Sequence, residues 1–255
     1  MTKKRLLSKF FEIAVREGLC SSAMKLKAYL NYLFQDISSF RDKKMLDVGC
    51  GSGLYSFYAA CRGAKYCICL EPLLGGSTKD AYDKFRILQS ELSLSNVYLY
   101  TTRIQDFNAP GIKFDILLLH NSINHLDEDA CINLQYDKNA KKRYIFIFEK
   151  LRMLAAPRAK LIITDCSPCN FFARIGIRNP FAPNIEWHKH QSPEFWASML
   201  SNHGFTNPRI RWTPLNALIG LGRVGKLLSG NRFVSYFLIS HFLLVMDKIE
   251  HENAS

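Results

Sequence analysis

Short apolar segments alternate with helical segments through the middle of this 255-residue chain. The apolar segments are expected as strands at 44–48, 66–70, 97–101, 115–119 and 160–165. Helical patterns lie between them at 53–62, 78–93, 124–134 and 140–155. Strands that are apolar throughout and are joined by helices form parallel sheets that are covered on both faces. The alternation therefore predicts an α/β fold with a mostly parallel sheet and helices on both faces.

The two ends of the chain depart from this alternation. Two helical patterns within residues 6–36 precede the first strand, which predicts a helical N-terminal cap over 1–39 and a main domain over 40–255. Beyond residue 165 we expect a helix at 192–203, a strand at 208–212 and a last strand at about 237–247. The irregular segments at about 166–191 and 213–232 are too long for simple connections, and we expect them as cap insertions over a ligand.

The stretch "MLDVGCGSG" at 45–53 ends a strand with Gly49, Gly51 and Gly53 at alternate positions. Glycines at such a strand end let the backbone approach a nucleotide-like ligand closely, because no Cβ is in the way. The dinucleotide pattern G-x-G-x-x-G is not met in either register, since Leu54 and Ser56 stand where its third glycine belongs. The loop therefore predicts a nucleotide-like ligand other than a dinucleotide.

Several motifs in order resemble the class I S-adenosylmethionine-dependent methyltransferases, and among them the small-molecule and glycan methyltransferases. They are "LDVGCGSG", Glu71 after the second strand, "RIQDF", "FDILLLHNSINHL" and "SPEFWASMLSNHGF". The resemblance implies a Rossmann-like seven-stranded sheet whose last strand is antiparallel. It also implies S-adenosylmethionine as the cofactor, S-adenosylhomocysteine as its product, and a cofactor site formed by Asp47, Gly49, Gly51, Gly53, Glu71, Asp106 and His120. A carboxylate such as Glu71 accepts hydrogen bonds only, which suits two ribose hydroxyls.

Methyl transfer to a hydroxyl needs a base as well as an in-line arrangement of the reacting atoms. His120, at the end of the fourth strand, and His188 and His190, in "EWHKHQ", are the candidate catalytic bases. A structural hydrogen bond is the alternative role for His120, and an exposed loop position is the alternative for the other two. A metal-assisted reaction would need carboxylates after both the fourth and fifth strands. Only Asp165 qualifies, so we predict no metal site.

Charge and cysteine content narrow the partner and the compartment. The chain carries a formal charge of +12, and residues 171–232 hold eight Lys and Arg against two acidic residues. This excess predicts an anionic acceptor, with a merely solvated basic surface as the alternative. Most of the eight cysteines lie inside apolar stretches and no second C-x-x-C pair completes a zinc site, so reduced thiols and a cytoplasmic protein are expected. The stretch "LNALIGLGRVGKLL" at 215–228 is compatible with peripheral contact at the inner face of a membrane.

These observations predict a methyltransferase that O-methylates a polar, anionic small molecule or a lipid- or nucleotide-linked glycan. A nucleic-acid (RNA) methyltransferase is an alternative, but "HNSI" stands after the fourth strand where base amino methylases carry Asn/Asp-Pro-Pro-Tyr/Phe/Trp. No recognisable RNA-binding module is present either, so nucleic acid is the less favoured partner. A second alternative, from another class, is a non-catalytic subunit that binds S-adenosylmethionine.

Overall fold

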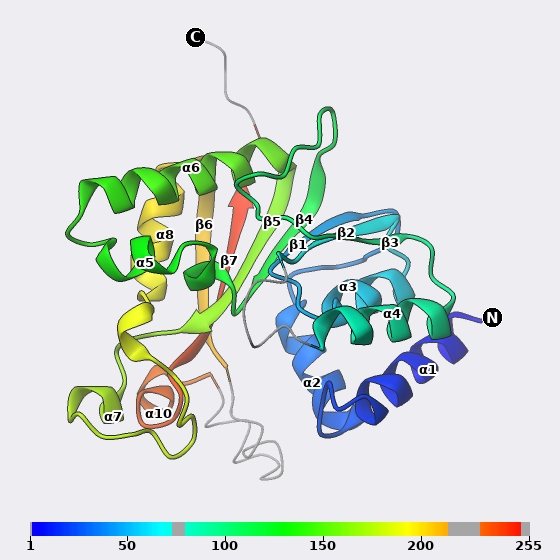
Figure 1. The fold of residues 1–255 in the computed structure, drawn as a ribbon, viewed down its shortest axis with the longest axis horizontal. Coiled ribbons are helices and arrows are strands. Elements are labelled where there is room, and N and C mark those ends of the chain that lie inside the picture. Colours follow the sequence, from blue (N-terminus) through cyan, green and yellow to red (C-terminus); the bar gives the residue numbers. More distant parts are fainter. Residues whose placement is uncertain (1, 73–79, 214–229, 251–255) are drawn as a thin grey trace. The chain divides into compact units, whose positions relative to one another are not determined.

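The computed structural model describes residues 2–72, 80–213 and 230–250 (Figure 1). Seven strands form one sheet in the order β3-β2-β1-β4-β5-β7-β6. β1 is parallel to β2 and to β4, and β2 is parallel to β3, whereas β6 and β7 are antiparallel. The strands are β1 (Lys44–Val48), β2 (Tyr66–Leu70), β3 (Val97–Tyr100), β4 (Phe114–His120), β5 (Ala155–Cys166), β6 (Phe205–Trp212) and β7 (His241–Lys248). The predicted seven-stranded, mostly parallel sheet with an antiparallel last strand is confirmed.

Several element boundaries differ from those predicted. β5 begins at Ala155, five residues earlier than expected, because the chain passes directly from α6 into the strand and takes a positive φ of 61° at Arg158. The helix expected at 124–134 is split, because the Asp127 side chain caps a new helix by accepting from the backbone of Ala130. The last strand starts at His241, since a short helix occupies residues 232–236.

Contacts divide the chain into two compact units. The first unit contains residues 1–120 and 154–160, and the second unit contains 121–153 and 161–255. The predicted roles of 1–39 as a cap, and of 166–191 and 213–232 as cap insertions, stay predictions. Most of 213–232 lies outside the described residues.

The first unit packs its helices around buried aromatic side chains. Thr2 and Ser22 cap the first two helices, and Phe10, Ile13 and Leu30 of those helices are fully buried. Burial of such large apolar side chains stabilises the folded state by about 2 kcal/mol each. The N-terminal helices are therefore part of the core of this unit. Its helices are α1 (Lys3–Arg16), α2 (Ala23–Leu33), α3 (Leu54–Cys61) and α4 (Ala81–Leu92).

The second unit is built around Trp196, which is fully buried against Tyr144 and Phe148. The Tyr144 hydroxyl donates to the carbonyl of Ile123 at 2.8 Å, so its one polar group is satisfied inside the core. The helices are η2 (Ile123–Leu126), α5 (Glu128–Asn133), α6 (Lys138–Leu154), α7 (Phe171–Arg174), η3 (Trp187–Lys189), α8 (Pro193–Ser201) and α10 (Arg232–Tyr236). Within the described parts of the chain, no helix has the length and hydropathy needed to span a bilayer.

Candidate active site

The glycine loop after β1 adopts a backbone that only glycine takes without strain. Gly49, Gly51 and Gly53 all have positive φ, at 71°, 52° and 72°. A Cβ on Gly53 would lie 2.8 Å from the ring of Phe85, so this position is fixed by packing. A Cβ on Gly51 would meet no other side chain or backbone of the described residues within 4 Å. That a ligand lies over Gly51 stays a prediction.

Glu71 holds this loop from the end of β2. Its side chain is 6% exposed, and its Oε2 accepts a hydrogen bond from the backbone N–H of Gly51 at 2.8 Å. A carboxylate has about four acceptor positions, and this bond uses one of them. Glu71 therefore fixes the loop and keeps capacity to accept hydrogen bonds from a ligand.

Asp47 lies under the same loop and is fully buried. The Ser56 hydroxyl donates to its Oδ2 at 2.8 Å, whereas its Oδ1 is buried without a hydrogen-bond partner. Burial raises the pKa of Asp47 to about 7, and the nearby negative charge of Glu71 adds to the rise. A cationic ligand group would favour the ionised form and satisfy the open oxygen.

Asp106 differs from the other predicted cofactor ligands. Its side chain is 55% exposed, and its Oδ2 accepts from the Arg103 guanidinium, with the Nη2 atom at 2.8 Å. Asp106 follows β3 as predicted, but it is already paired at the surface.

His120 ends β4 between two tyrosines of the first unit. The hydroxyls of Tyr29 and Tyr55 lie 2.7 Å and 2.9 Å from its Nε2, and the Tyr55 ring lies 4.2 Å from the imidazole. Burial raises the pKa of Tyr55 well above its ordinary value, so this phenol stays protonated. With its Nε2 engaged by two hydroxyls, His120 is held as a positioned hydrogen-bonding group. No sequence motif marks these tyrosines, because their helical spacing is that of ordinary core residues.

His190 forms a pair with Asp165 in the second unit. Its Nδ1 lies 2.9 Å from Asp165 Oδ1, and the two side chains are 11% and 2% exposed. The Cys166 backbone N–H also donates to that oxygen, at 2.8 Å. An imidazole whose Nδ1–H donates to a carboxylate carries its other nitrogen as an acceptor, which is the arrangement of a general base. His188, by contrast, is exposed on η3.

A third histidine stands in the same unit. His241 Nε2 lies 2.7 Å from Asn121 Oδ1, and its Nδ1 lies 2.7 Å from the Thr213 hydroxyl. Because the amide oxygen only accepts, Nε2 carries the proton and Nδ1 accepts from Thr213. Burial, with the charge of His190, lowers the pKa of His241 to about 4, so this ring is neutral.

The chain is similar to known methyltransferases in sequence and in structure. No family model matches the chain. Curated relatives are protein arginine N-methyltransferase 1 of Saccharomyces cerevisiae, 25% identical over 118 residues, and that of Oryza sativa subsp. indica, 32% identical over 110 residues. These segments cover 46% and 43% of this chain but 32% and 27% of the relatives, so the chain spans about a third of their length.

Solved structures match over nearly the whole chain. A putative S-adenosylmethionine-dependent methyltransferase from Listeria monocytogenes has a TM-score of 0.61 at 15% identity and covers 88% of this chain and 99% of that one. The chain has the class I S-adenosylmethionine-dependent methyltransferase fold. The N-methyltransferase NodS from Bradyrhizobium japonicum, in complex with S-adenosyl-L-homocysteine, matches with a TM-score of 0.52 at 13% identity, covering 90% of this chain and 88% of that one.

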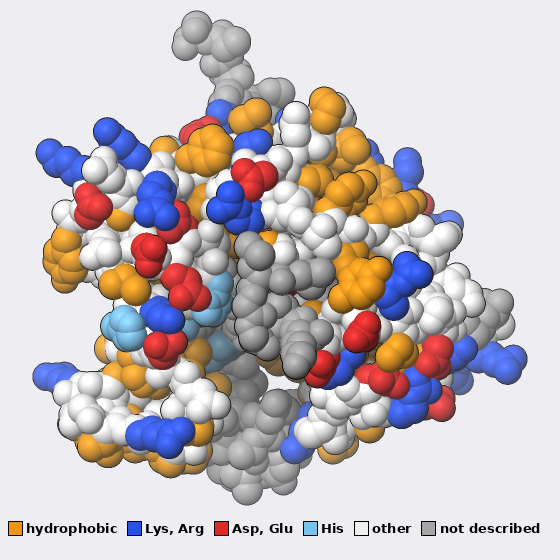
Figure 2. All heavy atoms as spheres, in the orientation of Figure 1, with side chains coloured by type: hydrophobic (Ala, Val, Ile, Leu, Met, Phe, Trp, Pro, Cys, Tyr) orange, Lys and Arg blue, Asp and Glu red, His pale blue; other side chains and the backbone are white. Residues whose placement is uncertain are grey.

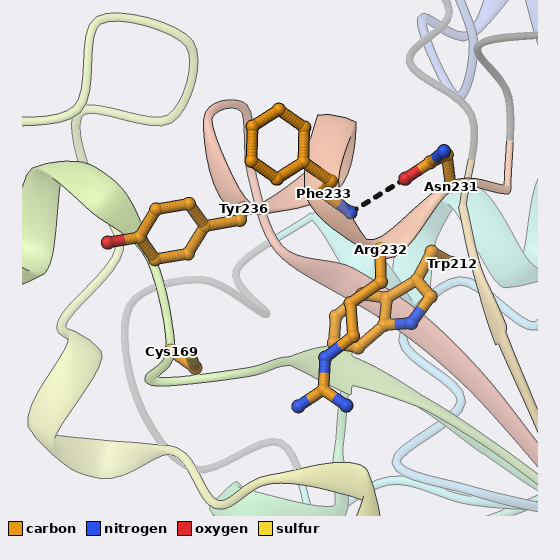
Figure 3. A pocket seen from close by; sticks show the side chains of 6 residues that line it. All are labelled: Cys169, Trp212, Asn231, Arg232, Phe233 and Tyr236. Carbon is orange, nitrogen blue, oxygen red and sulfur yellow. Dashed lines mark hydrogen bonds between the residues drawn. The ribbon is translucent and has the colours of Figure 1, made fainter.

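A pocket of about 420 Å³ lies in the second unit of this methyltransferase fold (Figure 3). Aromatic side chains of β6 and α10 form much of its wall, and the Arg232 guanidinium lies over the Trp212 ring, 5.6 Å from the centroid. The same arginine pairs with Glu194 at 3.1 Å. The lining residues are Cys169, Trp212, Asn231, Arg232, Phe233 and Tyr236. Arg and aromatic faces both bind planar groups.

The basic excess predicted for residues 171–232 is partly paired. Arg209 binds Asp247 through both terminal nitrogens, and Lys189 pairs with Glu128 and Glu186. Arg223, Lys226 and the predicted membrane segment 215–228 lie outside the described residues. Among the residues that are described, no group of three or more His, Cys, Asp or Glu side chains is placed to hold a metal ion.

Proposed function

We propose that this chain transfers the methyl group of S-adenosylmethionine to a hydroxyl of an anionic acceptor, a small molecule or a lipid- or nucleotide-linked glycan. The pair formed by His190 and Asp165 carries this proposal, because a hydroxyl is the acceptor type that requires a base.

The first unit would hold the cofactor. The open backbone at Gly51, the acceptor capacity of Glu71 and the unsatisfied Oδ1 of Asp47 fit a ligand that carries hydroxyl donors and a cationic group. When bound, the cofactor supplies a methyl group on a good leaving group, so the chain needs to provide binding, orientation and proton removal. Asp106 is the weakest part of the predicted set, because Arg103 already occupies it.

His190 is the proposed base. His190 would take the hydroxyl proton of the acceptor on its Nε2 while that oxygen accepts the methyl group that the cofactor would supply. Asp165 then stabilises the imidazolium through the Nδ1–H bond. His120 is less suited to this step, because its Nε2 already meets two tyrosine hydroxyls. His188 is exposed, and within the described part of the chain no carboxylate lies at hydrogen-bond distance to orient its ring as Asp165 orients that of His190.

The pocket beside Trp212 supports an anionic acceptor with a flat or ring-shaped part. Arg232 contributes a positive charge to a wall that is otherwise largely aromatic. Sugar and aromatic rings both pack on such walls, and a phosphate or carboxylate on the ring would pair with the guanidinium. This agrees with the anionic partner predicted from the charge of residues 171–232.

Methylation of a protein arginine is the second candidate, favoured by the similarity to protein arginine N-methyltransferase 1. A guanidinium acceptor is cationic and is best bound by uncommitted carboxylates. The acidic residues that begin α5 are already engaged: Asp127 pairs with Arg143, and Glu128 pairs with Lys189. Arg232 is likewise paired with Glu194, so the His190–Asp165 pair is the observation that favours a hydroxyl acceptor.

Labelled S-adenosylmethionine separates the candidates. The full chain is incubated with hydroxylated anionic compounds (hydroxybenzoates, sugar phosphates and nucleotide sugars), with an arginine-rich peptide, and with RNA. We expect label in the first group and none in the peptide or the RNA. Label in the peptide supports the second candidate instead, and label in RNA supports a nucleic-acid methyltransferase. Cofactor binding with no transfer to any acceptor would indicate the non-catalytic subunit.

A further inference from the structure

We propose that residues 171–181 and 232–237 of the second unit, here called the α7–α10 surface, dock the protein on an anionic lipid bilayer. This inference is independent of the proposed acceptor and base. It concerns residues other than the predicted membrane segment 215–228, which lies outside the described part of the chain.

Large apolar side chains are exposed together on this surface. Ile175, Ile177 and Phe181 are 49%, 51% and 55% exposed, and Phe233 and Phe237 are 70% and 38% exposed. Figure 2 shows apolar and basic side chains gathered on the lobe that carries α7. Single exposed apolar residues are common, but a group of this kind usually marks a binding surface.

The two segments that form the α7–α10 surface contain basic but no acidic residues, although Arg232 pairs with Glu194 of α8. The sequence has no Asp or Glu between residues 166 and 185 or between 231 and 240, and Arg174, Arg178 and Arg232 fall within these segments. Arg174 and Arg178 are exposed, and the partners of Arg178 are the neutral oxygens of Pro183 and Asn184. This combination is complementary to anionic headgroups, each of which can pair with an arginine while apolar side chains enter the interface.

Helix α6 of the same unit provides the contrast. It also exposes apolar side chains, with Phe146 at 52% and Met153 at 57%, and it carries several lysines. Of its cations, however, Arg143 pairs with Asp127 and Arg152 pairs with Glu149. Two arginines of α6 are thus neutralised by carboxylates, whereas the partners of Arg178 on the α7–α10 surface are neutral oxygens.

Buried asparagines hold the two segments of this surface together. Asn170 and Asn179 are each 1% exposed, and both donate to the carbonyl of Leu238, at 3.0 Å and 2.6 Å. Above them, the rings of Phe171 and Phe237 are 5.1 Å apart. The exposed side chains are thus presented on a preformed support, which lowers the entropic cost of docking.

Vesicle co-sedimentation of the full chain tests the proposal. Vesicles of phosphatidylcholine with about one third phosphatidylserine are compared with phosphatidylcholine alone. We expect binding to the anionic vesicles that weakens as salt rises, and much weaker binding to the neutral ones. The variant Ile175→Ser/Ile177→Ser/Phe181→Ser should bind about 100-fold more weakly. At low salt, Arg174→Gln/Arg178→Gln should bind about 30-fold more weakly than the wild type. This difference should disappear at high salt, because salt screens the attraction between arginine and the headgroups.

Matched changes on α6 serve as controls. Phe146→Ser and Lys141→Gln/Lys142→Gln alter exposed residues of the same types and should change vesicle binding by less than about threefold. Equal sedimentation with neutral and anionic vesicles, or none with either, overturns the proposal without any variant. The proposal is also overturned if an α6 variant loses as much vesicle binding as the triple variant does. A self-association in the absence of lipid that the triple variant abolishes, with no vesicle binding by the wild type, would assign the surface to a protein contact instead.

Discussion

The two units place their functional groups in different ways. In the first unit, Glu71 reaches the glycine loop only 20 residues away, and the groups that meet lie at the ends of two paired parallel strands. In the second unit, His190 reaches Asp165 from the far end of an irregular segment. A site built on strand ends follows from the order of motifs, whereas a site built on a long loop depends on how that loop folds.

The units also respond in opposite ways to pH. The first unit buries an acid, Asp47, whose pKa is raised to about 7. The second unit buries a base, His241, whose pKa is lowered to about 4. Both groups are neutral in the folded state at mildly acidic pH, so each makes unfolding depend on pH with its own sign.

The largest expected effect is on the glycine loop. Gly51→Leu places a side chain in the open space above the loop, so we expect no detectable binding of S-adenosylmethionine by calorimetry. Gly18→Leu is the matched control, because Gly18 also has a positive φ, 68°, and open space around its Cβ. The control should bind as the wild type does, which separates backbone strain from ligand exclusion. Unchanged binding by Gly51→Leu would mean that the ligand does not lie over this loop.

The pH dependence of unfolding follows from the two buried groups. Asp47, with its raised pKa, stabilises the folded state below pH 4, and this contribution of up to about 4 kcal/mol is lost as pH rises through about 7. His241, with its lowered pKa, stabilises the folded state above pH 6.5, and up to about 3 kcal/mol is lost as pH falls through about 4.

Urea unfolding of two variants resolves these contributions. Relative to the wild type, Asp47→Asn should gain stability as pH rises from about 4 to about 7, and His241→Gln should lose relative stability as pH rises from about 4 to about 6.5. Parallel curves for a variant and the wild type would show that the residue concerned titrates alike in the folded and unfolded chain.

Replacement of the proposed base should lower turnover and leave cofactor affinity unchanged. His190→Ala is expected to lower kcat by about 100-fold or more on the acceptor found in the labelling assay, because no other group receives the proton. Asp165→Asn should reproduce part of the loss. Full activity of His190→Ala would return the role of base to His120 or His188, to be distinguished by the same substitution there.

The smallest effects compare two predicted cofactor ligands. Glu71→Gln should weaken cofactor binding by about tenfold, since it removes a buried charged acceptor. Asp106→Asn should weaken it by about twofold or less, since Asp106 is half-exposed and paired with Arg103. Calorimetric titration of both variants measures the order, and a larger loss for Asp106→Asn would restore Asp106 as a main ligand.

Much of the fold could be predicted because its signals are local. The strand-and-helix alternation gave the sheet, and the positive φ values at Gly49, Gly51 and Gly53 agree with the glycine motif. The early start of β5 was missed, because Pro157 and Arg158 normally indicate a turn, yet here the strand passes through them. Tertiary context overrides such local preferences.

The site was predictable to the extent that its residues stand at strand ends. His120 was expected at the end of β4, but its tyrosine partners come from α2 and α3, and no motif marks them. His190 was expected as one of three equivalent histidines. What distinguishes it is contact with Asp165, and side-chain contact between distant positions cannot be inferred from a single sequence.

The central proposal is that Gly51 lies in the cofactor site and that His190 acts as the base. Calorimetric titration of S-adenosylhomocysteine into the wild type, Gly51→Leu and His190→Ala tests it most directly. The account predicts that His190→Ala binds with wild-type affinity and that Gly51→Leu does not bind. A loss of affinity in His190→Ala as large as that in Gly51→Leu, or wild-type binding by Gly51→Leu, would contradict it.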